Sequence, residues 1–483
     1  MNNKTVVSGL EPQAVFSIFS DICAIPHGSG NTEAVRAYCR EFAENLGYEN
    51  ICDDCGNILI RVPASAGREN DAPVMLQGHL DMVCEKESGN TTDFLTDGLK
   101  LLVDGDFLTA DGTTLGGDDG IAVAMILALI SDKAASHPAL EVLFTTDEET
   151  GMNGAVGFDC SLLKSKTLIN LDSENESTVW VACAGGMRAN IDFSITRTEC
   201  SAENTADITL TGLAGGHSGA EIDKGRINAV KALAAFLKQY GDGSGLELIS
   251  FNGGLMDNAI PREASARVAV KDFKAFKADA DGYIEKLLKG ATEADKNAVI
   301  ICNNHGGSVC SVFCEEHKNA VLGFLTEAPN GIIAMSNDIE GLVQTSLNIG
   351  ITKTAAEGFH ASFSLRSSVN SEKAELSKNL KAAAEKYCAA YSTYGEYPAW
   401  EYNEISPLRD LYASVYEELN GRKCGIEAIH AGLECGIFYD KIENLDCISV
   451  GPDMHDIHTP QERLSIKSTA AVYETVREVL KRI

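Results

Sequence analysis

Short apolar segments alternate with helical segments through the first 180 residues, and this alternation restricts the fold more than any other feature of the chain. Each apolar segment has the length of a strand, and four of them are 57–62, 73–76, 140–145 and 167–171. Helical patterns at 31–46 and 120–130 are interspersed with these strands. Strands separated by helices form largely parallel sheets. The alternation therefore predicts an α/β fold with a mainly parallel sheet flanked by helices.

The middle of the chain differs in character from its two ends. Between 186 and 398, amphipathic segments such as 207–213 are interrupted by glycine-rich turns, which is typical of an α+β unit. The α/β pattern then returns, with a helix at 407–419, a strand at 447–450 and a helix at 464–481. A chain of 483 residues also exceeds the size of one ordinary core. We expect a discontinuous domain, 1–185 plus 399–483, with 186–398 inserted into it.

The chain is strongly acidic. It has 40 basic and 70 acidic residues, so its net charge is −30. A surface of this sign repels phosphate backbones and anionic lipid headgroups. We therefore expect neither nucleic acid nor a membrane surface as a partner, and the simplest interpretation of the charge is solubility.

Cysteine usage and the absence of targeting signals indicate a cytoplasmic location. The 15 cysteines are odd in number and scattered, and many have apolar neighbours, as buried reduced thiols do. The opening MNNKTVVSGLEPQ has no apolar run behind a basic segment, so it shows no signal peptide. The longest apolar stretch, 121–130, is too short to span a bilayer.

Metal-ligand residue types follow several of the predicted strands. They are His79 and Asp81 after 73–76, Glu148 and Glu149 after 140–145, Asp172 after 167–171, and His458 after 447–450. A glycine turn before the helix at 120–130 adds Asp118. One carboxylate in such a place is more often a helix cap or a solvated loop residue. Functional groups of α/β sheets gather beyond the carboxyl ends of the strands, so the whole set favours one shared site.

This set of residues makes chemical sense as a two-ion site. Its imidazoles and carboxylates suit zinc or a similar borderline cation. A pair of ions about 3.5–4 Å apart shares a bridging carboxylate and activates a water. Asp81, two residues beyond His79, is placed to orient that imidazole. Of the adjacent Glu148 and Glu149, one can bind metal while the other serves as general base.

Five segments closely resemble the M20 metallopeptidases, which have a zinc-peptidase-like fold. They are GHLDMV, LGGDDGIA, TTDEETG, INLDSE and GPDMHDIHTP. The resemblance runs from IPHGSGNTE near the start to the C-terminal helix. GHSG at 216–219, DNAIPRE at 257–263 and HAGLECG at 430–436 are similar to the aminoacyl-histidine (beta-alanyl-histidine) dipeptidase branch.

The resemblance implies metal-dependent hydrolysis of dipeptides, with Xaa-His dipeptides such as carnosine foremost. It implies two divalent ions, zinc first, with manganese and cobalt as alternatives. The implied ligands are His79 and Asp172 for one ion, Glu149 and His458 for the other, and Asp118 as the bridge, which precedes an implied cis peptide. Glu148 would be the general base and acid, and Asp81 would orient His79. His455 is a second histidine near this site, but the family pattern favours His458.

The inserted domain resembles the lid of this family. The resemblance implies that His217 reaches the tetrahedral intermediate and that Arg366 holds the substrate carboxylate, a task suited to a guanidinium. Asn258 is a candidate for a polar contact with the substrate, and Glu434 for binding its amino group. From the residues alone, an exposed turn histidine and an exposed strand arginine remain alternatives.

Other functions stay open at this stage. Another M20 activity, such as that of a broader dipeptidase, a tripeptidase or an aminoacylase, would use the same two ions. A catalytically silent binding protein of the same fold would have lost Glu148 or a ligand, and none is lost. The small peptide substrate is the expected partner, and the chain is expected to be a monomer or a homodimer.

Overall fold

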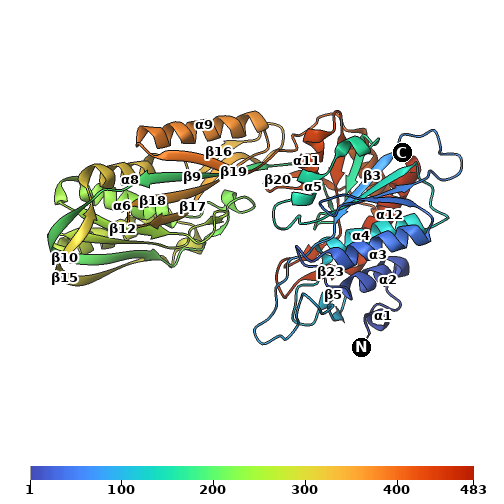
Figure 1. The fold of residues 1–483 in the computed structure, drawn as a ribbon, viewed down its shortest axis with the longest axis horizontal. Coiled ribbons are helices and arrows are strands. Elements are labelled where there is room, and N and C mark those ends of the chain that lie inside the picture. The colour runs from blue at the N-terminus through green and yellow to red at the C-terminus, as the bar shows by residue number, and fades with distance from the viewer. Residues whose placement is uncertain (1) are drawn as a thin grey trace. The chain divides into compact units, whose positions relative to one another are not determined.

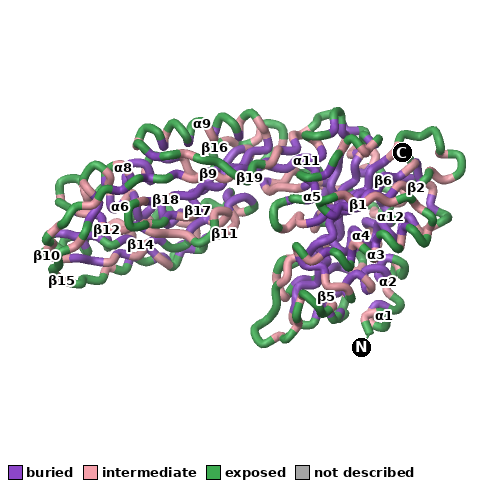
Figure 2. The backbone as a smooth tube through the Cα atoms, in the orientation of Figure 1, coloured by how far each residue is buried: buried purple, intermediate pink, exposed green. Residues whose placement is uncertain are grey.

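The structure is a computed structural model that describes residues 2–483, and it divides into two compact units. Unit 1 contains the chain as far as Cys183 together with Tyr402–Ala428 and Leu433–Ile483, and unit 2 contains Ala184–Glu401 and Ile429–Gly432. Figure 1 labels many of the elements in both units, and Figure 2 shows that each unit has its own buried interior.

An eight-stranded sheet forms the centre of unit 1. In spatial order its strands are β1 (Glu49–Cys52), β2 (Ile58–Val62), β6 (Leu140–Thr145), β3 (Val74–His79), β7 (Thr167–Asn170), β21 (Asp446–Ser449), β8 (Thr178–Cys183) and β20 (Gly425–Ile429). The pairs β6/β3, β3/β7 and β7/β21 are parallel, whereas β1/β2, β2/β6 and β21/β8 are antiparallel. The predicted α/β class is confirmed, and its parallel character lies in the four central strands.

The central strands are buried from end to end. Every residue of β3 and β6 is buried. Strands covered on both faces read as continuous apolar runs, which is why the sequence reveals them. His79 is the register partner of Thr145, and Gln77 is the partner of Asn170. Because these strands run in the same direction, their carboxyl ends meet at one edge of the sheet.

Helices pack around this sheet (Figure 1). They are α1 (Asn3–Val6), α2 (Gln13–Cys23), α3 (Glu33–Asn45), α4 (Gly117–Ser131), α5 (Asn153–Gly157), α10 (Pro407–Asn420), α11 (Glu434–Lys441) and α12 (Ile466–Arg482). Helix α4 packs against β3 and α2 and is buried from Gly117 to Ile130. Gly116 precedes it with a φ of +65°, and a side chain there would meet the Met82 sulfur.

A second, small sheet in unit 1 has the order β22-β23-β5-β4. Its strands are β4 (Leu101–Asp104), β5 (Phe107–Ala110), β22 (Met454–His455) and β23 (Arg463–Ser465). Each strand has only two to four residues, too few for a periodic pattern to reveal them in the sequence. This sheet anchors both ends of the loop that carries His458.

Unit 2 contains a nine-stranded sheet, and its neighbouring strands pair in antiparallel fashion. In spatial order its strands are β15 (Val299–Phe313), β10 (Arg197–Thr211), β14 (Ala264–Val270), β12 (Glu247–Gly253), β17 (Val343–Thr354), β18 (Gly358–Ser367), β9 (Gly185–Ser194) and β19 (Ala390–Tyr397), with β16 (Gly331–Met335) on β17. A hairpin pairs β11 (Gly216–His217) with β13 (Ala259–Ile260). The helices are α6 (Ala229–Ser244), α7 (Phe273–Lys289), α8 (Glu315–Glu327) and α9 (Asn370–Lys386).

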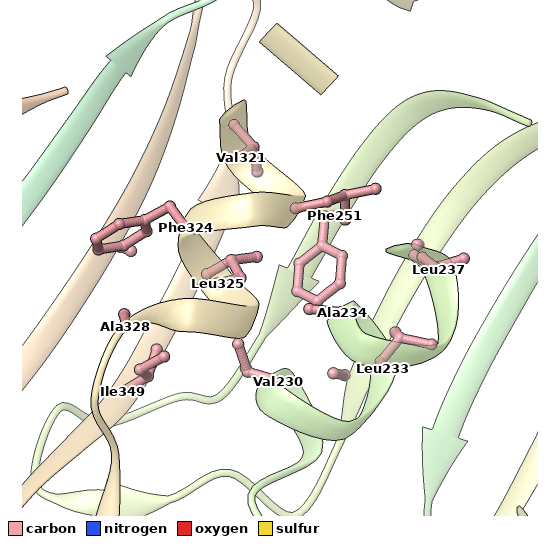
Figure 3. Close-up of a cluster of buried hydrophobic side chains, with 14 of the residues drawn as sticks. Val230, Leu233, Ala234, Leu237, Phe251, Val321, Phe324, Leu325, Ala328 and Ile349 are labelled. Atoms are coloured by element: carbon pink, nitrogen blue, oxygen red, sulfur yellow. The ribbon is translucent and has the colours of Figure 1, made fainter. Parts of the chain in front are cut away.

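The core of unit 2 forms where α6 and α8 cover the sheet (Figure 3). Side chains spaced three or four residues apart on each helix point inward, as an amphipathic helix requires. The labelled core residues are Val230, Leu233, Ala234 and Leu237 of α6, Val321, Phe324 and Leu325 of α8, Ala328 directly after α8, Phe251 of β12 and Ile349 of β17. Among residues 2–483, no helix combines the length and the apolar character that a bilayer span requires.

Candidate metal centre

One aspartate faces both histidines of the predicted site. Asp118 Oδ1 lies 3.0 Å from His79 Nε2, and Asp118 Oδ2 lies 3.1 Å from His458 Nε2. Asp118 is buried in the first turn of α4, where its φ of −80° and ψ of 104° depart from helical values. A single carboxylate therefore presents one oxygen to each of two neighbouring imidazoles.

Two ligand groups share this aspartate. One contains His79, Asp118 and Asp172, and the other contains Asp118, Glu149 and His458; within each group the ligand atoms lie within 4.8 Å of one another. His79 Nε2 is 3.7 Å from Asp172 Oδ1, and His458 Nε2 is 3.0 Å from Glu149 Oε1. The structure thus brings together all five residues that the sequence suggests as ligands.

The fold explains why these side chains converge. His79 is the last residue of β3, and Asp172 and Glu149 follow β7 and β6, so the parallel strands deliver all three to one edge. His458 lies on the loop between β22 and β23 with a φ of +60°. Such a conformation is uncommon for a residue other than glycine and is typical of functional sites.

Asp81 holds the loop that carries two of the site's carboxylates. Its Oδ1 accepts a hydrogen bond from the Glu148 N–H at 3.1 Å, and its Oδ2 accepts from the Glu149 N–H at 3.3 Å and the Ser29 hydroxyl at 2.8 Å. His79 Nδ1 lies 2.9 Å from the Asp81 backbone oxygen but 3.5 Å from its carboxylate. The backbone of Asp81 therefore orients the imidazole more closely than the carboxylate does.

The ligand cluster strongly favours positive charge. Although burial lowers it, the neighbouring Asp172 and Asp118 carboxylates raise the pKa of His79 well above its usual value. Hydrogen bonds to Asp118 and Glu149 raise the pKa of His458 to about 11. The direction of both shifts indicates that the carboxylates around these imidazoles favour positive charge in the cluster. Imidazole and carboxylate are ligands of zinc and similar divalent ions, so the donor set fits two such ions.

Glu148 lies beside the two groups that share Asp118. Burial raises the pKa of Glu148 well above its usual value; His79 opposes this shift, and the carboxylates of Asp172, Glu434 and Glu149 add to it. Glu148 also belongs to a third group of nearby ligand atoms, with His79 and Glu149. A carboxyl whose pKa is raised above its usual value is suited to accepting and donating a proton.

A buried polar layer lies immediately before the ligands on the central strands. Asn170 Nδ2 donates to Gln77 Oε1 at 2.6 Å, and Gln77 Nε2 donates to Glu434 Oε2 at 2.5 Å. Thr145 Oγ1 donates to the same Glu434 oxygen at 2.6 Å. Glu434 is fully buried, its pKa is raised by burial to about 7, and within residues 2–483 its Oε1 has no hydrogen-bond partner. In the sequence, this layer is marked by the polar residues Gln77, Thr145 and Asn170 within otherwise apolar strands.

In unit 2, the structure brings His217 and Arg366 together. Arg366 Nη2 lies 3.5 Å from His217 Nε2, and Arg366 Nη1 donates to the Tyr397 hydroxyl at 3.3 Å. Burial and the nearby Arg366 charge lower the pKa of His217 to about 4, so this imidazole is neutral at pH 7. Arg366 is only 7% exposed, and among residues 2–483 its Nε has no hydrogen-bond partner. A buried cation with an unpartnered N–H group is uncommon and favours an anionic ligand.

Two further residues lie near this pair in unit 2. The Asn258 carbonyl accepts a hydrogen bond from the Ser218 N–H at 2.8 Å, which places Asn258 beside the His217 turn. His430 was not foreseen: its Nε2 is 2.7 Å from Ser346 Oγ. A side chain on Gly219 would come within 2.5 Å of the His430 backbone oxygen. Contacts between such distant segments leave no spacing signal in the sequence.

The loop around His458 contains two other residues of note. His455 is exposed, and its ring centroid is 5.7 Å from that of Phe107; it belongs to none of the ligand groups found among residues 2–483. Glu462, which sequence reasoning overlooked, is buried and accepts hydrogen bonds from the backbone before Asp118. Nothing in the sequence distinguishes it from an ordinary loop glutamate.

Fold and site together define a class: α/β proteins with a candidate two-ion centre at the carboxyl ends of parallel strands. Residues 75–482 match the sequence profile of peptidase family M20/M25/M40. The cytosol non-specific dipeptidase of Escherichia coli K12 is 37% identical over 480 residues, which are 99% of each chain. The chain belongs to the M20/M25/M40 peptidase family, as the sequence motifs predicted.

Solved structures agree with this assignment. The crystal structure of aminoacylhistidine dipeptidase from Vibrio alginolyticus has 36% sequence identity and a TM-score of 0.90, covering 99% of this chain and 98% of that one. A tripeptidase from Staphylococcus aureus has 14% identity and a TM-score of 0.60, covering 98% of both chains. The second likeness shows a shared fold.

Proposed function

We propose that this protein hydrolyses dipeptides, including Xaa-His dipeptides such as carnosine, with the help of two divalent ions, zinc in the first place. The observation that carries the proposal is the position of Asp118, whose two oxygens lie 3.0 and 3.1 Å from two different imidazoles. The names of the Escherichia coli and Vibrio alginolyticus relatives support the substrate class.

In this proposal, His79 and Asp172 hold one ion, Glu149 and His458 hold the other, and Asp118 bridges them. Bound divalent ions polarise a carbonyl oxygen and lower the pKa of a water molecule. The carboxylates supply the negative charge that keeps such ions in place. Manganese and cobalt suit the same donor set.

Glu148 supplies the proton transfers. Its carboxylate takes a proton from the attacking water and delivers it to the leaving amine nitrogen, which needs a group that is readily protonated. The raised pKa of Glu148 supports this role. Asp81 acts as the positioning residue, because it accepts hydrogen bonds from the backbone N–H groups of Glu148 and Glu149.

Four side chains are proposed to contact the substrate. Arg366 binds its carboxylate, and the unpartnered Nε of this buried side chain supports that assignment. Neutral His217 donates a hydrogen bond to the oxyanion, Asn258 makes a polar contact, and Glu434 offers its unpartnered Oε1 to the amino group.

We also propose that the domain predicted at 186–398 serves as the lid, that the protein is cytoplasmic, and that it is a monomer or a homodimer.

The test is a panel of dipeptides, tripeptides and acylated amino acids, assayed with metal analysis on one preparation. We expect the highest kcat/KM for dipeptides; a clear preference for acylated amino acids would refute the substrate assignment.

Glu148→Ala should lower turnover by a factor of about 100 or more while the metal content stays unchanged. Glu149→Ala is the matched neighbour and should lose metal. Equal metal loss in both variants would contradict the separate roles.

A further inference from the structure

We infer that Glu462 is a positioning residue that aligns Asp118 with His458, an inference that rests on the proposed metal centre. Glu462 Oε2 accepts hydrogen bonds from the N–H groups of Leu115 at 2.7 Å and Gly116 at 3.2 Å. Glu462 Oε1 accepts from the N–H groups of Gly117 at 2.8 Å and Asp118 at 3.4 Å. One carboxylate thus receives four consecutive backbone N–H groups, ending at the residue that bridges the two ligand groups.

These N–H groups need an acceptor from elsewhere in the chain. The first turn of a helix leaves its N–H groups without intrahelical partners, and a negative charge at this end is stabilising. Gly116 gives α4 no side-chain cap, and Asp118 itself is not helical. A side chain on Gly117 would lie 3.1 Å from Glu462 Oε1, so glycine is what lets the carboxylate approach the backbone closely. The turn before Asp118 is therefore built around the Glu462 carboxylate.

The same residue belongs to the loop of the second histidine. Glu462 follows His458 by four positions, and its N–H donates to the Thr459 carbonyl at 3.1 Å. Its own carbonyl accepts from Thr109 Oγ1 of β5 at 2.8 Å, directly before β23 begins. The backbone of Glu462 is thus held by the small sheet while its side chain holds the turn of Asp118. Glu462 thus connects two of the proposed ligands. It shares a loop with His458, and its side chain is hydrogen-bonded to the turn that carries Asp118.

Glu462 does not act as a ligand itself. It is only 2% exposed, both of its oxygens accept backbone hydrogen bonds, and it is in none of the ligand groups formed by the described residues. Its influence on the centre must pass through the backbone of Asp118 and the loop of His458. Partners of this kind affect metal affinity about 10–100-fold when they are removed.

The experiment compares Glu462→Gln with Glu141→Gln. Glu141 is a matched control: it is also buried, and its carboxylate accepts from the N–H groups of Lys164 and Ser165 at 2.9 Å, in a different part of unit 1. Zinc affinity is measured by chelator competition. Amide hydrogen exchange is measured for a peptide covering 115–118, with and without zinc. The melting temperature of each variant is recorded as well. We expect Glu462→Gln to bind zinc about 10–100-fold more weakly and to exchange faster at 115–118 even without zinc. Glu141→Gln should lower the melting temperature and keep the wild-type zinc affinity.

Two results would overturn the inference. One is zinc affinity within twofold of wild type in Glu462→Gln, and the other is an equal loss of affinity in Glu141→Gln. If Glu462→Gln does not fold, Glu462→Asp replaces it; this variant keeps the charge but shortens the reach, and wild-type zinc affinity there would also refute the inference. His458→Ala separates the two proposals. If it retains all bound zinc, the proposed centre fails, whereas zinc loss in His458→Ala without loss in Glu462→Gln refutes the role of Glu462 alone.

Discussion

His430 makes unit 2 sensitive to acid, and the size of this effect follows from its burial. Burial, followed by the charges of Arg366 and His217, lowers the pKa of His430 from 6.5 to about 3. In the unfolded chain the imidazole takes up a proton below its ordinary pKa, whereas the folded protein excludes that proton until the pH approaches 3. Stability is therefore fully present above pH 6.5 and is lost as the pH falls below it. Between pH 7.5 and 5.0 the loss amounts to about 2 kcal/mol of unfolding free energy.

The assay is the stability of unit 2, measured by native-state hydrogen exchange of the core peptides in β17 at the two pH values. We expect His430→Gln to lose about 2 kcal/mol less than the wild type between them. Ser346→Ala is the control, because it removes the partner of His430 Nε2 while the imidazole stays buried. It should keep most of the pH dependence, since burial is the largest cause of the shift. Identical pH dependence in His430→Gln and the wild type would refute the reasoning.

Three further predictions concern the centre and the core. Asp118→Asn should weaken binding of both ions, because its oxygens face both imidazoles; metal analysis that shows one ion fully retained would contradict this. Phe324→Ala removes a fully buried ring from unit 2 and should cost about 3–5 kcal/mol in urea unfolding, and a loss below 1 kcal/mol would show that the core collapses around the gap. Chelation should lower the melting temperature and added zinc should restore it, whereas an unchanged temperature would argue against the proposed centre.

The central strands could be predicted because burial on both faces leaves a continuous apolar run. The strand predicted at 140–145 is β6, and the one predicted at 167–171 is β7, shorter by one residue. The strand predicted at 73–76 continues in the structure through Gln77 to His79. Gln77 and His79 interrupt the apolar pattern, so the pattern alone ends the strand too early. Their side chains are buried because they interact with residues far along the chain, which the local sequence does not reveal. Three of the ligand types were visible in the sequence because His79, Glu149 and Asp172 stand at or shortly after the ends of such runs.

Other features depend on pairings that no local pattern records. The amphipathic segment at 207–213 overlaps the end of β10, which begins at Arg197, ends at Thr211 and pairs along most of its length with β15, about a hundred residues later. Its first half is polar and partly exposed, so it has no apolar alternation. Likewise, the partners of Glu462 and His430 are set by tertiary register. Burial and hydrogen bonding of single polar residues could not be read from spacing.

The short stretch Ile429–Gly432 belongs to unit 2 although the chain on either side of it belongs to unit 1. Unit 2 is therefore not a contiguous piece of sequence that could be cut out or exchanged between relatives as a cassette. A fragment spanning 184–401 would lack His430 and leave the Ser346 hydroxyl, buried in the intact chain, without its imidazole partner. Recombination, proteolytic dissection and domain transplantation would all have to carry these few residues along with 184–401.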